Sequence, residues 1–382
     1  MKKLICLVLI FILVPVPMRA KAIEVSAKYA CVMEAVTGEV VWEKNSHETY
    51  AMASTTKIMT ALLAIEAGTL NDTVTVSQKA SLQEGSSIYL KAGDKINMRD
   101  LLYGLMLNSG NDAAVAVAEH VSGSTEAFAE KMTARAHEIG ANDTAFKNPN
   151  GLDEEGHYTT AYDLALITRA ALKNPAFSEI VASKSKKATL LENGTDLYFT
   201  NHNKMLKLYE GADGVKTGYT KATGRCLVSS ATRNGIRMIA VTLNAPNDWK
   251  DHAAMLDFAF DGYEMQTVVQ SGAALKQINT PNGVVEISAQ EEVCYPVQKG
   301  KSASCEVVLH IPKFIQPPVA RGEKIGEAEV LVAGREVKRF DLISSSEILV
   351  PVENKKSIGS CFEKIFKNLL LTGEKKDIID PK

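Results

Sequence analysis

Apolar positions recur with a helical period through much of the N-terminal part of the chain. The runs 29–35 and 39–44 alternate instead and are separated by Thr37 and Gly38, which predicts a hairpin. Helices are expected at residues 55–67, 98–107, 112–121, 125–139 and 161–172. After Asp213 the alternation that is typical of strands returns. Strands are expected at residues 214–217, 225–231 and 237–243, followed by a closing helix at 249–263.

The chain after about Gln266 has a different pattern. Short alternating runs replace the helical period and are divided by glycine, proline and charged turns, which predicts strands. The runs lie at residues 284–288, 293–297, 305–311, 328–332 and 337–342. We therefore expect a separate small all-β domain over residues 265–352, after a larger domain over residues 23–264.

The last segment, residues 353–382, carries an amphipathic helical pattern. Its apolar side chains recur three and four positions apart, which places them along one face of a helix. They are Ile358, Cys361, Phe362, Ile365, Phe366, Leu369 and Leu370. Lysines flank this face, as in helices that lie in a membrane interface. We expect a membrane anchor here; a helix packed on its own protein, or one that binds a partner, is the alternative.

Residues 1–22 have the order of a secretory signal peptide. Two lysines precede an apolar run over residues 4–14, and small residues around Lys21 suit a cleavage point. A buried N-terminal helix or a retained membrane anchor is the alternative, but the apolar run is short for a membrane span. We expect a mature chain from about Ile23, exported to the outer face of the cytoplasmic membrane or to the cell wall.

Composition narrows the classes of function. The chain has 382 residues, of which 46% are apolar and 23% charged, so two globular domains are expected. A net charge of -2 gives no basic surface for nucleic acid, and neither a phosphate-binding glycine loop nor a dense Cys/His cluster is present. We expect no cofactor and no metal. The cysteines after residue 22 are treated as structural, although Cys294 and Cys305 could pair in an oxidising compartment.

Three short motifs follow one another along the chain. They are Ser-Thr-Thr-Lys at 54–57, Ser-Gly-Asn at 109–111 and Lys-Thr-Gly at 216–218. Each motif alone is weak, because Ser-x-x-Lys also occurs at Ser183 and Lys186, where no apolar helix follows. The three together, in this order, are a stronger signal.

The first motif has the residues that an activated serine requires. Ser54 and Lys57 are three positions apart at the start of an apolar helix, so both side chains lie on one face and can touch. A lysine can take the serine proton only if its pKa is depressed, which burial and a second cation such as Lys216 would achieve. The N–H groups at the helix start, that of Ser54 included, would stabilise the anionic oxygen of an attacked carbonyl.

The ordered motifs and their surroundings resemble the low-molecular-mass penicillin-binding proteins, a family of serine-type D-alanyl-D-alanine carboxypeptidases. The resemblance is carried by residues 53–60, 107–112, 148–152 and 214–220. It implies an α+β fold: an antiparallel sheet flanked by helices, a small all-β C-terminal domain and a terminal amphipathic helix. It also implies that the protein removes the terminal D-alanine from peptidoglycan pentapeptide stems and that β-lactams inhibit it.

The same resemblance assigns catalytic roles to the first two motifs. Ser54 would be the nucleophile that forms an acyl-enzyme, and Lys57 the base that activates it. Ser109 and Asn111 would relay protons and hold the peptide.

The third motif would bind the substrate. Lys216 would supply positive charge and Thr217 would contact the terminal carboxylate. Gly218 would leave room for an extended peptide along the strand edge, and the N–H of Tyr219 would be the second donor to the oxyanion.

The sequence does not exclude two alternative functions, and it departs from the family pattern at one place. A class A β-lactamase would need a carboxylate to direct water, for which only the acidic loop 153–155 is available. A non-catalytic penicillin sensor or wall-binding protein would never release its acyl group. Some family members hold the substrate carboxylate with an arginine near the closing helix, but residues 247–252 contain none. Lys250 or His252 could replace it.

Overall fold

The computed structural model describes residues 23–332 and 334–349. The expected signal segment and amphipathic tail lie outside these residues. The described chain forms two compact units. The first extends to Met265 and includes Pro296–Ser302, and the second comprises Gln266–Tyr295 and the chain from Ala303 onward.

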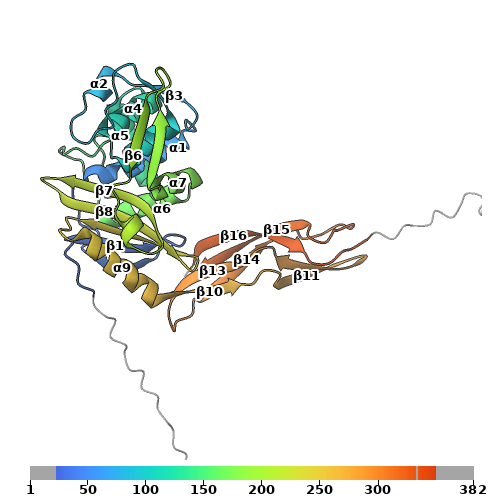
Figure 1. Ribbon diagram of the computed structural model, residues 1–382. Helices are drawn as coiled ribbons and strands as arrows, with labels where there is room; N and C mark the ends of the chain where they lie inside the picture. Colours follow the sequence, from blue (N-terminus) through green and yellow to red (C-terminus); the bar gives the residue numbers. More distant parts are fainter. Residues whose placement is uncertain (1–22, 333, 350–382) are drawn as a thin grey trace, which may run out of the picture. The chain divides into compact units, whose positions relative to one another are not determined.

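The first unit is built around a five-stranded sheet (Figure 1). In spatial order its strands are β2 (Val40–Lys44), β1 (Tyr29–Glu34), β9 (Ile236–Leu243), β8 (Gly224–Arg233) and β7 (Ala212–Thr220). All neighbouring strands pair antiparallel, which confirms the expected sheet. β7 is an edge strand, so one of its two sides forms no ladder within the sheet.

Helices cover both faces of this sheet, which explains why the central strand β9 is almost entirely apolar. On one face, α9 (Asp248–Gly262) packs Met255 and Leu256 into a cluster with Met238 and Ala240 of β9. The β9 side chains on the other face of the sheet, among them Val241, belong to the core that the other helices form. The alternating side chains of one strand therefore join two separate apolar layers.

The predicted helices of this part of the first unit are all present: α1 (Lys57–Glu66), α3 (Met98–Leu107), α4 (Asn111–Ser122), α5 (Thr125–Ile139) and α6 (Ala161–Leu172). The shorter helices α2 (Gln78–Ser81), α7 (Pro175–Ala182) and α8 (Met205–Leu208) were not predicted. Capping side chains set several starts: Oγ of Ser124 accepts the N–H of Ala127 at 3.1 Å, and Oγ1 of Thr160 accepts that of Asp163 at 3.0 Å.

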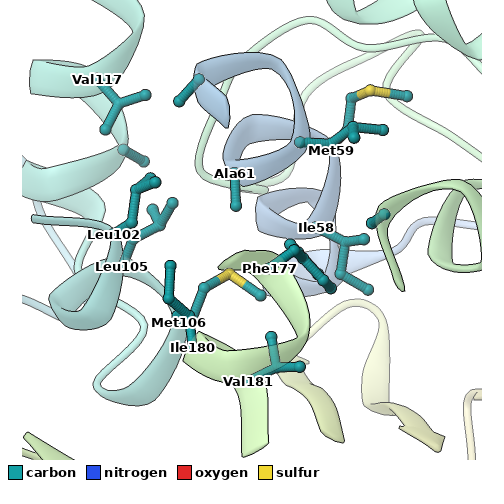
Figure 2. Packing of buried hydrophobic residues seen from close by; sticks show 14 of the residues in the cluster. Ile58, Met59, Ala61, Leu102, Leu105, Met106, Val117, Phe177, Ile180 and Val181 are labelled. Carbon is teal, nitrogen blue, oxygen red and sulfur yellow. The ribbon is translucent and has the colours of Figure 1, made fainter. Parts of the chain in front are cut away.

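Helix α1 is enclosed by apolar neighbours (Figure 2). Ile58 and Ala61 lie among side chains of α3 and α7, including Leu105 and Phe177, and all four are fully buried. Truncating a buried aromatic such as Phe177 to alanine would cost about 3–5 kcal/mol. This packing excludes water from the first turn of α1, where Lys57 stands.

Two small two-stranded sheets in the first unit were not predicted. They are β3 (Thr73–Thr75) with β4 (Lys95–Asn97), and β5 (Ser185–Thr189) with β6 (Asp196–Thr200). Each strand is short and buries a single residue, so its sequence lacks the repeated apolar alternation by which strands are recognised.

The second unit is all-β, as expected. Its main sheet has the order β11 (Ala274–Thr280), β12 (Gly283–Ala289), β16 (Arg335–Ser344), β15 (Lys324–Val332) and β14 (Cys305–His310). β10 (Tyr263–Val269) pairs with β13 (Val293–Gln298) in a second, two-stranded sheet. Ile287, Val330 and Leu342 form part of the core. Cys294 and Cys305 are free thiols, so the pairing considered from the sequence is not formed.

Within residues 23–332 and 334–349, no helix combines the length and apolar character that crossing a membrane requires.

Candidate active site

Ser54 lies in a 3₁₀ turn, Ala53–Thr56, that leads directly into α1. In this tighter helix, side chains three positions apart eclipse one another. Nζ of Lys57 therefore lies 2.9 Å from Oγ of Ser54, the contact expected from their spacing. The second Ser-x-x-Lys copy is unlike this one: Oγ of Ser183 donates to the carbonyl of Glu179, and the amine of Lys186 lies over the ring of Tyr103.

The amine of Lys57 is held by three oxygen atoms. Besides Oγ of Ser54, Oδ1 of Asn111 lies at 2.8 Å and the carbonyl oxygen of Asn150 at 2.5 Å. A neutral amine has two N–H groups and one lone pair. When the amide and carbonyl oxygens accept the two N–H groups, the lone pair is directed at the Ser54 hydroxyl. The geometry is therefore that of a base ready to accept the serine proton.

Burial lowers the pKa of Lys57 well below its usual value, because the charged form loses its hydration. The positive charge of Lys216 lowers it further, and the carboxylate of Asp112 acts in the opposite direction. Lys57 is fully buried. The amine is thus favoured in its neutral, proton-accepting form.

The second motif forms the turn between α3 and α4. Ser109 has a φ of +63°, and Ala53, the residue before Ser54, has a φ of +48°. Such values are unfavourable for residues with a side chain and occur where the surroundings enforce them, often at functional sites. Asn111, the first residue of α4, points to Lys57. Ser109 is buried in the same turn, and its hydroxyl forms no hydrogen bond with Ser54 or Lys57 among the described residues.

The third motif lies on the edge strand β7, against the nucleophile turn. A Cβ on Gly218 would lie 3.2 Å from the backbone nitrogen of Ser54 and equally close to the carbonyl of Met52. Glycine is therefore needed for the close approach of β7 to the turn. The side chain of Thr217 is half-buried at the free edge of β7, whereas that of Tyr219 is 65% exposed.

Lys216 is buried on the same strand and donates from Nζ to the carbonyl of Thr217 at 2.9 Å. Loss of hydration lowers the pKa of Lys216 to about 7. Its charge can therefore change near neutral pH.

Two backbone N–H groups face the space between the turn and the strand. The N–H of Thr220 donates to Oγ1 of Thr223 within the β7–β8 turn, and successive N–H groups of a strand point in opposite directions. The N–H of Tyr219 consequently points to the free edge of β7. The N–H of Ser54 makes no backbone hydrogen bond among the described residues.

The roles of two residues of the site were not predicted, although Asn150 lies in a stretch that carries the family resemblance. The carbonyl oxygen of Asn150 holds Lys57, and a backbone acceptor can belong to any residue. The imidazole of His202 is partly exposed and close enough to Lys216 for that charge to lower its pKa, after the larger effect of burial. The segment around His202 is tied to β7, because Nδ2 of Asn203 donates to the carbonyl of Gly214 at 2.7 Å.

Lys250 and His252, suggested from the sequence in place of a carboxylate-binding arginine, differ in their exposure to solvent. His252 is wrong for this role: it is fully buried, Nε2 lies 2.9 Å from Oγ1 of Thr242, and burial lowers its pKa to about 3. Lys250 is exposed. The start of α9 instead presents Asp248, which forms an ion pair with Arg225 at 2.9 Å.

The acidic loop does not hold a carboxylate against the nucleophile. Oδ1 of Asp153 accepts the hydroxyl of Thr220 at 3.0 Å, and Oε2 of Glu154 accepts Nδ2 of Asn148 at 3.0 Å. Neither carboxylate contacts Ser54 or Lys57 by a hydrogen bond. Across the described residues, no group of three or more His, Cys, Asp and Glu side chains is placed to bind a metal ion.

Comparisons with known proteins agree with this geometry. Residues 16–247 match the family model of the D-alanyl-D-alanine carboxypeptidases, peptidase family S11, and residues 263–349 match that of the penicillin-binding protein 5 C-terminal domain. The chain is 37% identical over 314 residues to D-alanyl-D-alanine carboxypeptidase DacF of Bacillus subtilis, covering 78% of this chain and 80% of that protein. It is 30% identical to DacC of Escherichia coli, covering 85% and 84%.

Solved structures give the same result. The crystal structure of the D-alanyl-D-alanine carboxypeptidase DacD from Francisella tularensis is similar with a TM-score of 0.63 at 28% identity, covering 87% of this chain and 96% of that one. Penicillin-binding protein 5 from Haemophilus influenzae gives a TM-score of 0.63 at 26% identity, covering 86% and 99%. These matches do not favour the β-lactamase or sensor alternatives. The chain belongs to the S11 family of penicillin-binding D-alanyl-D-alanine carboxypeptidases.

Proposed function

We propose that this carboxypeptidase works through an acyl-enzyme on Ser54, with Lys57 as the base. The single observation that carries the proposal is the 2.9 Å contact between Nζ of Lys57 and Oγ of Ser54, in a site that favours the neutral amine. Lys57 takes the hydroxyl proton while Oγ attacks the penultimate D-alanyl carbonyl. The C–N bond then breaks, and the departing D-alanine receives a proton through Ser109.

The oxyanion formed in this step is held by two N–H groups, those of Ser54 and Tyr219. Their position supports this role, since one stands on the nucleophile turn and the other points out from the edge of β7. A preorganised donor of this kind contributes about 3–4 kcal/mol to a transition state. Water then attacks the ester carbonyl while Lys57 accepts its proton. The bond between the carbonyl carbon and Oγ breaks, and Lys57 returns the proton to Oγ, which regenerates the Ser54 hydroxyl and the neutral amine.

The edge of β7 binds the end of the stem peptide. Thr217 and the positively charged form of Lys216 receive the terminal carboxylate, and Gly218 keeps the strand close to Ser54. Asn111 holds both Lys57 and the peptide. β-Lactams, whose strained amide resembles the D-alanyl-D-alanine bond, acylate the same hydroxyl.

The test is release of D-alanine from diacetyl-Lys-D-Ala-D-Ala by the full chain. We expect release by the native protein, none by Ser54→Ala, and a covalent penicillin adduct on the peptide that contains Ser54. Lys57→Gln, of similar length but unable to accept a proton, should lose at least about a thousandfold in acylation rate. An adduct on another residue, or release that persists in Ser54→Ala, would refute the assignment.

We further propose that residues 353–382 hold the enzyme at the outer face of the cytoplasmic membrane. The support is the amphipathic pattern with flanking lysines in the sequence. Removal of residues 353–382 should abolish sedimentation with vesicles that contain anionic lipid while D-alanine release continues. Unchanged sedimentation would exclude the anchor.

A further inference from the structure

The segment Gln83–Leu90 forms a wall attached directly to the groups that hold the catalytic amine. Nδ2 of Asn111 donates to the carbonyl oxygen of Glu84 at 2.6 Å. Nδ2 of Asn150 donates to Oε1 of the Gln83 side chain at 3.2 Å. Asn111 and Asn150 are also the residues whose oxygen atoms lie next to Lys57. The wall therefore stands beside the reaction site at a fixed position.

The buried carboxylate of Asp112 fixes the far end of this wall. It accepts hydrogen bonds from Oγ of Ser87 at 2.7 Å and from the N–H groups of Ile88 and Leu90 at 3.1 Å. Tyr89, which lies between these anchored residues, has a φ of +65°. A bulky residue is rarely found in this conformation, which costs on the order of 1 kcal/mol or more. The strain is sustained by the hydrogen bonds on either side.

The strained conformation directs an aromatic side chain into solvent. Tyr89 is 85% exposed, and among the described residues its side chain forms no hydrogen bond and no aromatic contact. Leu82, the residue just before the wall, is 71% exposed. A rigid exposed tyrosine provides a large contact area at low cost in conformational entropy. The arrangement is suited to contacting a part of the substrate that lies outside the active site.

The charge of the wall indicates which part of the substrate it fits. Between Leu82 and Tyr89 the exposed surface consists of Gly85, Ser86 and a single charged residue, Glu84. A stem peptide carries ionised groups, which would require charged partners. The N-acetylated sugars of the glycan are neutral and present hydroxyl groups together with apolar C–H faces, which suit serine, backbone and an aromatic ring.

We propose that Tyr89 and the wall bind the glycan to which the stem peptide is attached, with the Tyr89 ring stacked on a sugar face. The proposal deepens the carboxypeptidase assignment, since one substrate molecule occupies both places. A stem of about four residues upstream of the scissile bond reaches at most about 14 Å, so the sugars arrive near the rim of the site.

The test compares two substrates with the same scissile bond. One is diacetyl-Lys-D-Ala-D-Ala, which lacks sugars, and the other is the disaccharide pentapeptide. Tyr89→Gly removes the ring and relieves the strain, and should lower kcat/KM about tenfold for the disaccharide pentapeptide, through KM, while the tripeptide value stays unchanged. Tyr89→Phe should retain both values. Tyr198→Ala, a tyrosine that is 71% exposed on a regular strand, is the matched control.

A binding measurement separates this proposal from the catalytic one. The Ser54→Ala protein should bind a tetrasaccharide of N-acetylglucosamine, which is uncharged and carries no peptide, and the added Tyr89→Gly change should weaken that binding about tenfold. Equal losses on both substrates would mean that Tyr89 only positions the catalytic groups and would overturn the proposal, as would unchanged kinetics and unchanged tetrasaccharide binding. Absence of D-alanine release by the native protein would refute the catalytic assignment and leave the tetrasaccharide result readable.

Discussion

Gly151 packs its α-carbon against the carbonyl group of Ala53, the residue before the nucleophile. A Cβ on Gly151 would overlap that carbonyl and lie 2.9 Å from Oγ1 of Thr56, and the φ of Gly151 is +86°. The contact joins the turn that supplies the Asn150 carbonyl to the turn that supplies Ser54. The proposed base and the proposed nucleophile therefore stand on turns that meet at a backbone contact with no room for a Cβ.

Gly151→Ala should consequently damage both stability and catalysis. We expect the free energy of unfolding to fall by about 2–4 kcal/mol and the rate of acylation by a fluorescent penicillin to fall about a hundredfold. Gly68→Ala is the matched control, because Gly68 also has a positive φ, +75°, but has no atom near its Cβ position. It should lose only about 1 kcal/mol and acylate normally. Equal acylation rates for the two variants would contradict the role of the contact.

Loss of the positive charge of Lys216 should cause the decline of kcat/KM at alkaline pH. Its pKa is lowered to about 7 by burial, so its positive charge is present below that pH and lost above it. The substrate carboxylate is then bound less well, and kcat/KM for the tripeptide should decline above about pH 7. Burial and the charge of Lys216 also lower the pKa of Lys57, but Lys57 acts as a neutral base, so losing its proton as the pH rises favours activity and does not cause the decline.

Lys216→Arg separates these causes, because a guanidinium keeps its charge beyond pH 12. The alkaline limb should move upward in this variant, and the measurement is a profile of kcat/KM from about pH 5 to pH 10. A limb that stays in place after the substitution would show that another group causes it.

The long helices could be predicted from the sequence, because periodicity and capping agree there. α3, α5 and α6 have the expected bounds, each preceded by a residue whose side chain accepts a backbone N–H at the helix start. The hairpin of β5 and β6 was missed, because its strands carry mostly polar residues and each buries one side chain. Its position depends on tertiary packing rather than on local pattern.

The sequence predicted the central side chains of the site, but not the backbone carbonyl oxygen that joins them. Ser54, Lys57 and Asn111 were expected together and lie together. The Asn150 carbonyl could not be found, because a main-chain oxygen has no residue signature. His252 was wrong as a carboxylate ligand, since its place near the start of α9 does not show that its side chain points into the core.

Acid should destabilise the first unit through His157. Burial lowers the pKa of His157 to about 4; Nε2 lies 2.8 Å from Oγ1 of Thr56, and Nδ1 accepts the N–H of Lys147 at 3.0 Å. Because the unfolded chain binds the proton more readily, its contribution to stability is complete above about pH 6.5 and is lost as pH falls toward 4. The loss is on the order of 3 kcal/mol.

Urea unfolding at pH 7, 5 and 4 measures this loss. His157→Gln, which cannot titrate, should show a weaker dependence on pH than the native protein. His47→Gln is the control, because the side chain of His47 is 62% exposed. If His157→Gln and the native protein lose stability in parallel, the acid sensitivity lies elsewhere.

The approach of β7 to the nucleophile turn should be sensitive to a single methyl group. In Gly218→Ala the new Cβ would meet the backbone nitrogen atoms of Ser54 and Thr55 at 3.2 Å, so β7 must move outward by a few tenths of an ångström. The Tyr219 N–H moves with the strand, away from the oxyanion. We expect acylation by penicillin to slow about tenfold or more, with little change in stability. Gly262→Ala adds the same methyl group where no atom lies near. Its acylation rate should equal that of the native protein, and an equal rate for Gly218→Ala would show that the oxyanion donors tolerate the displacement.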